Sequence, residues 1–278
     1  MAFKVVITIY NRPPSKLTTD VIENAGIDVE YVPARTENEV ITAAKDADVL
    51  LVGTVPHTTR KVMEALPDLK MVGRSGVGVD SIDLATATEL GICATNTPGI
   101  NTSEVADHAM AMLLSITRKI PEQNAVLKAG AWSDRPAEVD ALRGQLRRIA
   151  GNTVGIFGLG SIGKGFANRV RGFGPSKIIA YDPYVPQTAA DLVGVEMVDF
   201  DTLLAESDYL TVHSPATDET NEIFNIDAFN KMKPTGVFIN CARGPIVDEA
   251  GLQEALETGV IYAAGIDVTQ IEPLDAES

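Results

Sequence analysis

The sequence predicts an α/β protein made of two doubly wound domains, each a parallel sheet covered by helices on both faces. Short, nearly continuous apolar runs rich in Val, Ile and Leu alternate with amphipathic stretches, which is typical of parallel strands buried on both faces. The alternation occurs twice, on either side of one long apolar helical stretch. A length of 278 residues, 45% of them hydrophobic, is ample for two domains with cores of their own.

The first series defines a domain at residues 1–101. Strands are expected at residues 4–10, 28–32, 49–52, 70–73 and 92–95, and helices at residues 16–24, 38–47, 59–65 and 81–89. A long helix at residues 103–119 then follows the competent N-caps Asn101, Thr102 and Ser103. It is more apolar all round than a one-faced surface helix, so it could cross between domains or pack against a second subunit. A loop with the only tryptophan, Trp132, is expected at residues 130–146.

The second series defines a domain at residues 102–278, which includes the long helix. Its strands are expected at residues 153–157, 177–181, 195–198, 209–213, 236–240 and 261–266. Its helices are expected to begin near Ser161, Thr188, Asp201, Ile226 and Val247.

Charge and cysteine content exclude several kinds of partner. A net charge of -15 argues against nucleic acid or an anionic membrane, since either needs a basic face. An anionic ligand would then have to be bound by backbone N–H groups, helix N-termini and a few arginines. Cys93 and Cys241 are too few for a disulfide framework or a cysteine zinc site, so we expect no metal and a reducing cytoplasm. No signal peptide or membrane-spanning run is evident.

A glycine motif directly follows a predicted strand and begins a predicted helix. Gly158 permits a tight turn, Gly160 lets the backbone approach a pyrophosphate, and Gly163 allows close packing of helix on strand. Asp182 ends the next strand, about 20 residues further on, where a carboxylate can accept both ribose hydroxyls and would repel a 2′-phosphate. This pattern predicts a dinucleotide site that prefers NAD to NADP; the alternative is that Asp182 only terminates a strand.

Two further polar groups follow later strands. Arg243 lies just past a buried strand, and its planar fork could hold a carboxylate and a neighbouring carbonyl together. A structural arginine that caps a loop or pairs with Asp248 is the alternative. Asp267 ends another strand with Glu272 in the loop beyond it, although two solvated carboxylates in a surface loop would look the same. All these positions fall at the carboxyl edge of one sheet, where α/β proteins bind ligands.

Several runs together resemble the D-2-hydroxyacid dehydrogenase family. They are, in order, NTPGINTSEVADHAMAMLL, GLGSIG, YDP, HSPATDET, NCARGPIVDE and DVTQIEPL. NCARG and GRSGVGVDSID are most similar to the phosphoglycerate dehydrogenase branch. The resemblance spans nearly the whole chain and implies reversible hydride transfer between NAD and C2 of a 2-hydroxy or 2-keto acid.

The resemblance also implies residue roles. The first domain would be a flavodoxin-like substrate domain, the second a Rossmann NAD domain, with the active site in the cleft between them. Arg243 would anchor the substrate, Glu272 would orient a catalytic histidine, and the backbone of Val77 and Gly78 would hold the substrate carboxylate. Arg74 matches an arginine of the phosphoglycerate branch, but the companion arginine of that branch is replaced by Gly53. The implied cofactor contacts, beyond the three glycines, are Ser161, Ile162, Asp182, His213, Ser214, Pro215, Cys241, Ala242 and Asp267.

The sequence departs from the family at its end. The family's general acid/base is a histidine beyond the glutamate, so a chain ending at Ser278 is expected to be part of a longer protein, and as it stands to bind NAD but turn over poorly. We do not expect His57, His108 or His213 to replace it; His108, inside a helix, is predicted to be a packing histidine. The family suggests a homodimer. An NAD-sensing scaffold like the co-repressor relatives is the alternative function, and formate dehydrogenase is disfavoured because that enzyme has glutamine where Glu272 stands.

Overall fold

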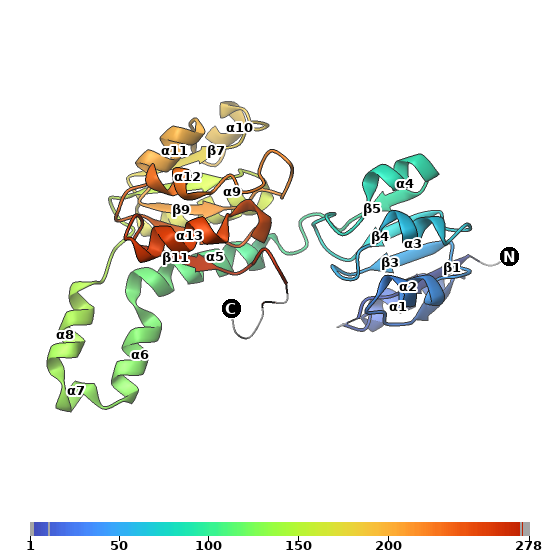
Figure 1. Ribbon diagram of the computed structural model, residues 1–278, viewed down its shortest axis with the longest axis horizontal. Coiled ribbons are helices and arrows are strands. Elements are labelled where there is room, and N and C mark those ends of the chain that lie inside the picture. The colour runs from blue at the N-terminus through green and yellow to red at the C-terminus, as the bar shows by residue number, and fades with distance from the viewer. Residues whose placement is uncertain (1–2, 11, 273, 275–278) are drawn as a thin grey trace. The chain divides into compact units, whose positions relative to one another are not determined.

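The computed structural model describes residues 3–10, 12–272 and 274, and it divides into two compact units, Met1–Asn101 and Thr102–Ser278 (Figure 1). Both units are parallel α/β sheets with helices on both faces, as the sequence predicts. None of the described helices is long and apolar enough to cross a membrane.

The first unit is a five-stranded parallel sheet in the order β2-β1-β3-β4-β5, which is the flavodoxin-like order. Its core has two faces: Val6, Leu50 and Val72 are buried on one, and Val5 and Ile7 on the other. The strands are β1 (Lys4–Ile7), β2 (Asp28–Tyr31), β3 (Val49–Val52), β4 (Met71–Arg74) and β5 (Cys93–Thr95). The helices are α1 (Lys16–Asn24), α2 (Glu37–Ala43), α3 (Arg60–Glu64) and α4 (Leu84–Leu90).

The second unit is a six-stranded parallel sheet in the order β11-β10-β9-β6-β7-β8. Counted from β6, this is the Rossmann order, with the switch point between β6 and β9. The strands are β6 (Thr153–Phe157), β7 (Lys177–Tyr181), β8 (Glu196–Met197), β9 (Tyr209–Val212), β10 (Val237–Asn240) and β11 (Ala263–Ile266). Every residue of β9 and β10 is buried, because helices cover both faces.

The second unit has nine α-helices among the described residues, and most of them pack on the two faces of this sheet (Figure 1). They are α5 (Thr102–Arg118), α6 (Ile120–Lys128), α7 (Ala131–Asp134), α8 (Pro136–Gly144), α9 (Ser161–Val170), α10 (Gln187–Asp191), α11 (Phe200–Glu206), α12 (Ile226–Asn230) and α13 (Glu249–Glu257), with 3-10 turns at Arg171–Phe173 and Gly244–Ile246. Although α5 is rich in apolar residues, it buries a single stripe that includes Ala106, Ala109 and Leu113.

The predicted loop at residues 130–146 is wrong, because this segment forms α7 and α8. Pro136 stands in the first turn of α8 with Glu138, and Arg143 lies in the last turn, which are ordinary helix-start and helix-end signals. The segment lacks an apolar stripe, and no residue of α6 or α8 is buried. Hydrophobic periodicity therefore missed part of the helical arm, formed by α6, α7 and α8, which projects from the body of the second unit in Figure 1.

Candidate functional site

The carboxyl ends of the second unit's strands bring the predicted polar groups to one edge of the sheet. Gly158 follows β6, Asp182 follows β7, His213 follows β9, Arg243 lies just past β10, and Asp267 follows β11. The strand order places Asp182 on one side of the glycine loop, with Arg243 and Asp267 on the other. A ligand lying across this edge would thus contact the glycine loop at its middle, with Asp182 near one end and Arg243 and Asp267 near the other.

Gly158 makes the turn out of β6 in a conformation that other residues rarely adopt. Its φ is +90°, and a Cβ there would lie 2.8 Å from Ser214 N and 2.9 Å from His213 C. Its N–H donates to Tyr181 O at 2.9 Å. The glycine thus joins the ends of β6, β7 and β9 at the switch point, as the motif predicts.

The other two glycines have different surroundings. A Cβ on Gly163 would lie 2.2 Å from Gly158 O, so α9 can approach the β6 turn only without a side chain at this position. A Cβ on Gly160 would meet nothing within 4 Å, so the backbone there faces open space. Gly160 is the N-cap of the ten-residue helix α9, and Ser161 and Ile162 form its first turn. Such a turn presents free N–H groups and the positive end of the helix dipole to an anion.

Asp182 is tied to the glycine loop. One carboxylate oxygen accepts from Leu159 N at 2.9 Å, and the other accepts from Tyr184 N at 2.9 Å. A carboxylate has about four lone-pair sites, so these two bonds leave acceptors for ribose hydroxyls. Nearby, the Tyr184 hydroxyl donates to Glu219 at 3.0 Å, a contact that sequence patterns did not indicate.

His213 and Ser214 approach the glycine loop through their backbone. The His213 ring instead packs on Phe166, with ring centroids 5.6 Å apart, and its Nε2 lies 3.1 Å from Thr211 Oγ1. Burial lowers the pKa of His213 to about 3. The imidazole is therefore neutral near pH 7, which argues against a proton-transfer role. Ser214 Oγ donates to Pro215 O at 2.9 Å, which shapes the segment beside the loop.

The turn that carries Arg243 is held by Asn240, which is 1% exposed. Asn240 Oδ1 accepts from Ala242 N at 3.0 Å, and its Nδ2 donates to Arg243 O at 2.9 Å. Arg243 is half-buried, and its Nη1 donates to Ala242 O at 2.7 Å. Asp248 accepts from Ala250 N as the N-cap of α13, so its carboxylate has a structural role of its own.

The loop of Glu272 lies directly against the Arg243 turn. A Cβ on Gly244 would fall 1.9 Å from Thr269 O, so these two backbones touch. Glu272 accepts from Thr269 N at 3.1 Å, and Gln270 N donates to Glu249 at 2.6 Å. The loop is therefore fastened to α13 and is more than a solvated surface segment.

The prediction that His108 is a packing histidine is wrong. Its side chain is 51% exposed, and its Nε2 lies 3.1 Å from Asp267 Oδ1. The residue belongs to the face of α5 that turns towards the end of β11, outside the buried stripe. Nothing in the sequence pairs positions 108 and 267, because the contact depends on how α5 crosses the sheet. Cys241 lies close to this pair, and burial, with Asp267 nearby, raises the pKa of its thiol to about 12.

The predicted substrate residues of the first unit lie at the end of β4 and in the loop after it. Arg74 donates from Nη1 to Ser75 O at 2.6 Å and from Nη2 to Thr54 Oγ1 at 2.8 Å. Val77 O accepts from the Asn96 side chain at 2.7 Å, whereas the N–H groups of Val77 and Gly78 have no acceptor within the described part of the chain. Two such donors suit a carboxylate.

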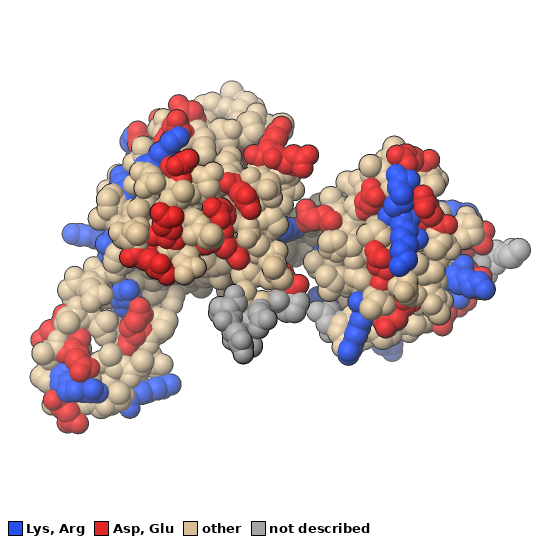
Figure 2. Space-filling model, in the orientation of Figure 1, with Lys and Arg blue, Asp and Glu red and all other residues tan. Residues whose placement is uncertain are grey.

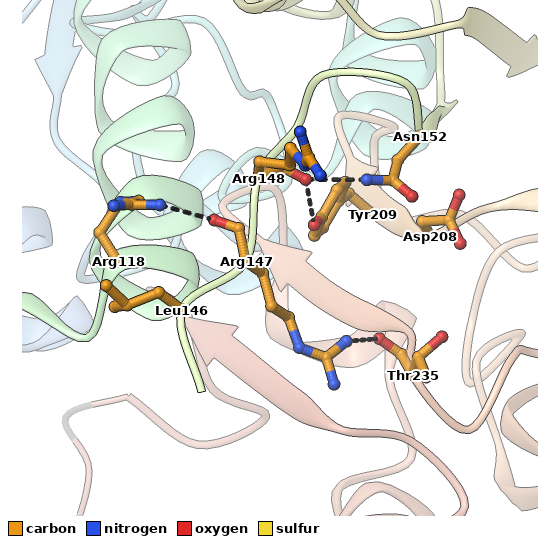
Figure 3. A pocket seen from close by; sticks show the side chains of 8 residues that line it. All are labelled: Arg118, Leu146, Arg147, Arg148, Asn152, Asp208, Tyr209 and Thr235. Atoms are coloured by element: carbon orange, nitrogen blue, oxygen red, sulfur yellow. Dashed lines mark hydrogen bonds between the residues drawn. The ribbon is translucent and has the colours of Figure 1, made fainter. Parts of the chain in front are cut away.

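Charge and cavities also indicate where an anion can bind. Figure 2 shows many acidic side chains on the visible face of the second unit's body, so positive potential must be local. A cavity of about 510 Å³ lined by Arg118, Arg147 and Arg148 lies at the amino ends of β6 and β9 (Figure 3). There Arg118 donates to Arg147 O and Arg147 to Thr235 O, so these two arginines brace the loop before β6. The glycine loop and sheet order instead define the carboxyl edge as the site of a dinucleotide-binding protein.

Comparison with known proteins agrees with this class. A family model of the D-isomer specific 2-hydroxyacid dehydrogenase NAD binding domain matches residues 110–278. D-3-phosphoglycerate dehydrogenase of Archaeoglobus fulgidus is 39% identical over 262 residues, which cover 94% of this chain and 48% of that protein. Hydroxypyruvate reductase of Thermotoga maritima is 39% identical over 264 residues, which cover 95% of this chain and 82% of that protein. The structure of NAD-dependent formate dehydrogenase of Staphylococcus aureus in complex with NAD has a TM-score of 0.84 at 28% identity. The match covers 99% of this chain and 84% of that protein.

The chain belongs to the D-isomer specific 2-hydroxyacid dehydrogenase family, which confirms the resemblance drawn from its motifs. NAD is the cofactor of this family's domain, and the open space beside Gly160 fits a bound pyrophosphate. The chain spans about half the length of the phosphoglycerate dehydrogenases it matches, 48% in the Archaeoglobus protein.

Proposed function

We propose that this chain binds NAD across the carboxyl edge of its second sheet and serves hydride transfer to or from C2 of a D-2-hydroxy or 2-keto acid. The observation that carries this proposal is the position of Arg243 on the same edge as the glycine loop. Its strand β10 is two strands from β6, roughly 10 Å at ordinary strand spacing. An extended dinucleotide with its adenosine ribose at Asp182 and its phosphates at Gly160 would bring the nicotinamide towards Arg243 and Asp267.

The role of the protein in such a reaction is to bind and polarise. The cofactor supplies the hydride chemistry. The Arg243 guanidinium would hold the substrate carboxylate and carbonyl together and stabilise negative charge that develops on the carbonyl oxygen. Glu272 is proposed to orient the histidine that exchanges the hydroxyl proton. Of the second unit's own histidines, His213 is half-buried and has a lowered pKa, and His108 contacts Asp267.

Relatives favour the enzyme over the scaffold alternative. The similar proteins carry the names of dehydrogenases and reductases, and two of them act by name on phosphoglycerate and hydroxypyruvate. Arg74 supports a phosphorylated substrate, whereas Gly53 in place of a companion arginine argues against it. The direct test is NADH titration followed by a panel of 2-keto acids that includes hydroxypyruvate and 3-phosphohydroxypyruvate. A chain with no affinity for NADH would refute the proposal.

The carboxylate of Asp182 should decide the choice between NADH and NADPH. Replacing Asp182 with Asn removes the charge that repels a 2′-phosphate and weakens the bonds to the ribose. Hydrogen bonds to charged groups contribute about 1.5–3 kcal/mol, so NADH affinity should fall roughly 10- to 100-fold while the preference over NADPH shrinks. Fluorescence titration with both cofactors measures this, with Asp191→Asn, an exposed acid of α10, as the matched control. An unchanged NADH-to-NADPH ratio would mean that Asp182 only terminates β7.

The helical arm supports the expected homodimer. In α6, α7 and α8 only Ala131 is buried, while Ile120, Leu127 and Trp132 are 53%, 46% and 63% exposed. Helices this short are marginal in water unless they pack on something. A second copy of the chain would cover these side chains and would account for a helical arm that has so little to pack on within its own chain.

Replacing Trp132 with Glu is therefore expected to produce monomers. A buried interface tryptophan is worth about 2–4 kcal/mol, so the dimer dissociation constant should rise by roughly 30- to 1000-fold. Light scattering over a range of protein concentrations measures the change. Leu192→Glu is the control, since Leu192 is 87% exposed and lies outside the arm. If both variants stay dimeric, the arm is not the interface.

A further inference from the structure

Three side chains with metal-binding atoms meet where α5 crosses the carboxyl ends of β10 and β11. His108 Nε2, Cys241 Sγ and an oxygen of the Asp267 carboxylate all lie within 4.8 Å of one another. The residues come from three separate parts of the chain. Neither Cys241 Sγ nor the His108 ring has a place in the substrate chemistry proposed above, so the cluster calls for its own explanation.

The spacing of these atoms suits a tetrahedral zinc ion. Zinc binds His nitrogen and carboxylate oxygen at about 2.0–2.1 Å and cysteine sulfur at about 2.3 Å, so tetrahedral ligands lie about 3.3 Å apart for N and O and about 3.6 Å apart for N and S. His108 Nε2 and Asp267 Oδ1 are already 3.1 Å apart. The 4.8 Å limit on the other pairs leaves shifts of about 1.2 Å or less, within the reach of side-chain rotation.

The fold holds this cluster at a defined place. A Cβ on Gly265 would lie 3.0 Å from Met112 Cε, so the bare backbone of β11 lets α5 come close. Met112, one turn after His108, places its Sδ 3.4 Å from Cys241 Sγ. The polarisable thioether of Met112 thus lies beside the thiol of Cys241. Sulfur atoms favour soft or borderline cations over Mg²⁺ or Ca²⁺.

The outer side is open to solvent. The His108 and Asp267 side chains are 51% and 46% exposed, whereas Cys241 is 7% exposed. An ion can thus reach the buried sulfur from outside through two exposed ligands and keep a water at the fourth position, as three-ligand zinc sites do.

We propose that His108, Cys241 and Asp267 form a Zn²⁺ site, and that Zn²⁺ bound there competes with NADH. The sequence predicted no metal because it contains only two cysteines. When the Sγ–Zn²⁺ bond forms, the thiol proton passes to solvent, and no group is oxidised or reduced. The competition rests on the proposed function, since Cys241 and Asp267 are also predicted cofactor contacts; the binding of Zn²⁺ does not.

The test is calorimetric titration of the metal-stripped chain with ZnCl₂ in the absence of NADH. Loss of a residue that only hydrogen-bonds to a zinc ligand typically weakens metal binding roughly 10- to 100-fold. His108→Gln or Cys241→Ser removes a ligand itself and should weaken Zn²⁺ binding by more than this. His57→Gln and Cys93→Ser are the matched controls, because both residues are exposed in the first unit and should leave binding unchanged. Co²⁺ in place of Zn²⁺ should give a thiolate charge-transfer band that Cys241→Ser abolishes. MgCl₂ should not bind.

A second titration separates this inference from the proposed function. Zn²⁺ should raise the apparent dissociation constant for NADH in the wild-type chain, and EDTA should reverse the effect. Zn²⁺ binding that is lost in both ligand variants supports the site even if NADH does not bind. NADH binding without Zn²⁺ binding, or Zn²⁺ binding that His108→Gln and Cys241→Ser leave unchanged, overturns it.

Discussion

Replacing Gly160 with Ala is expected to lower the affinity for NADH about 100-fold while leaving the chain folded. A Cβ at this position would meet no protein atom within 4 Å, so the fold has room for it. It would, however, occupy the space where a pyrophosphate must approach the first turn of α9. Displacing the phosphates costs one or two hydrogen bonds to a charged group, each worth about 1.5–3 kcal/mol. Fluorescence titration gives the affinity.

Two other glycines make this result interpretable. In Gly163→Ala the new Cβ would lie 2.2 Å from Gly158 O, so α9 must move and stability should fall by about 1–3 kcal/mol. Gly172 lies just beyond the opposite end of α9, and a Cβ there would meet nothing within 4 Å. Gly172→Ala should therefore change neither the NADH affinity nor the stability. For Gly160→Ala the melting temperature should fall by less than about 4 °C, the cost of a weaker N-cap. Full NADH affinity in Gly160→Ala would show that the loop does not cradle the cofactor.

Much of this architecture could be predicted because it depends on local sequence. β3, β6 and β7 match the predicted strands residue for residue, since parallel strands buried on both faces read as short apolar runs bounded by turns. The glycine motif could be located for the same reason, because Gly158 and Gly163 have no room for a side chain in this local turn. The ends of strands were less predictable: β1 stops at Ile7, although apolar residues continue beyond it.

What could not be predicted depends on packing between distant segments. His108 meets Asp267 only because α5 crosses the ends of β10 and β11, and no spacing within the sequence encodes that crossing. The contact of Gly244 with Thr269 is of the same kind. The prediction missed α8 for a different reason: Pro136, Glu138 and Arg143 mark its start and end, but the helix has no buried face, so hydrophobic periodicity had nothing to detect.

Replacing Arg243 with Ala is expected to abolish recognition of the substrate while leaving NADH affinity within a few-fold. The appropriate ligand is oxamate, which presents a carboxylate beside a carbonyl and does not turn over, so its binding to the NADH complex needs no proton donor. Loss of a charged, bidentate partner costs about 2–5 kcal/mol, so oxamate affinity should fall by roughly 30- to 4000-fold. Arg243→Lys keeps the charge but loses the fork, and should recover only part of this affinity.

The control for Arg243 lies at the opposite edge of the same sheet. Arg148 lines the basic cavity at the amino ends of β6 and β9, and its backbone carbonyl, which a side-chain substitution leaves in place, accepts from Tyr209 and Asn152 (Figure 3). Arg148→Ala should therefore keep both stability and oxamate affinity. If Arg148→Ala loses oxamate and Arg243→Ala does not, the anionic substrate binds in that cavity. The carboxyl edge would then bind the dinucleotide alone, because one guanidinium cannot serve ligands at both edges of a sheet whose strands are four or five residues long.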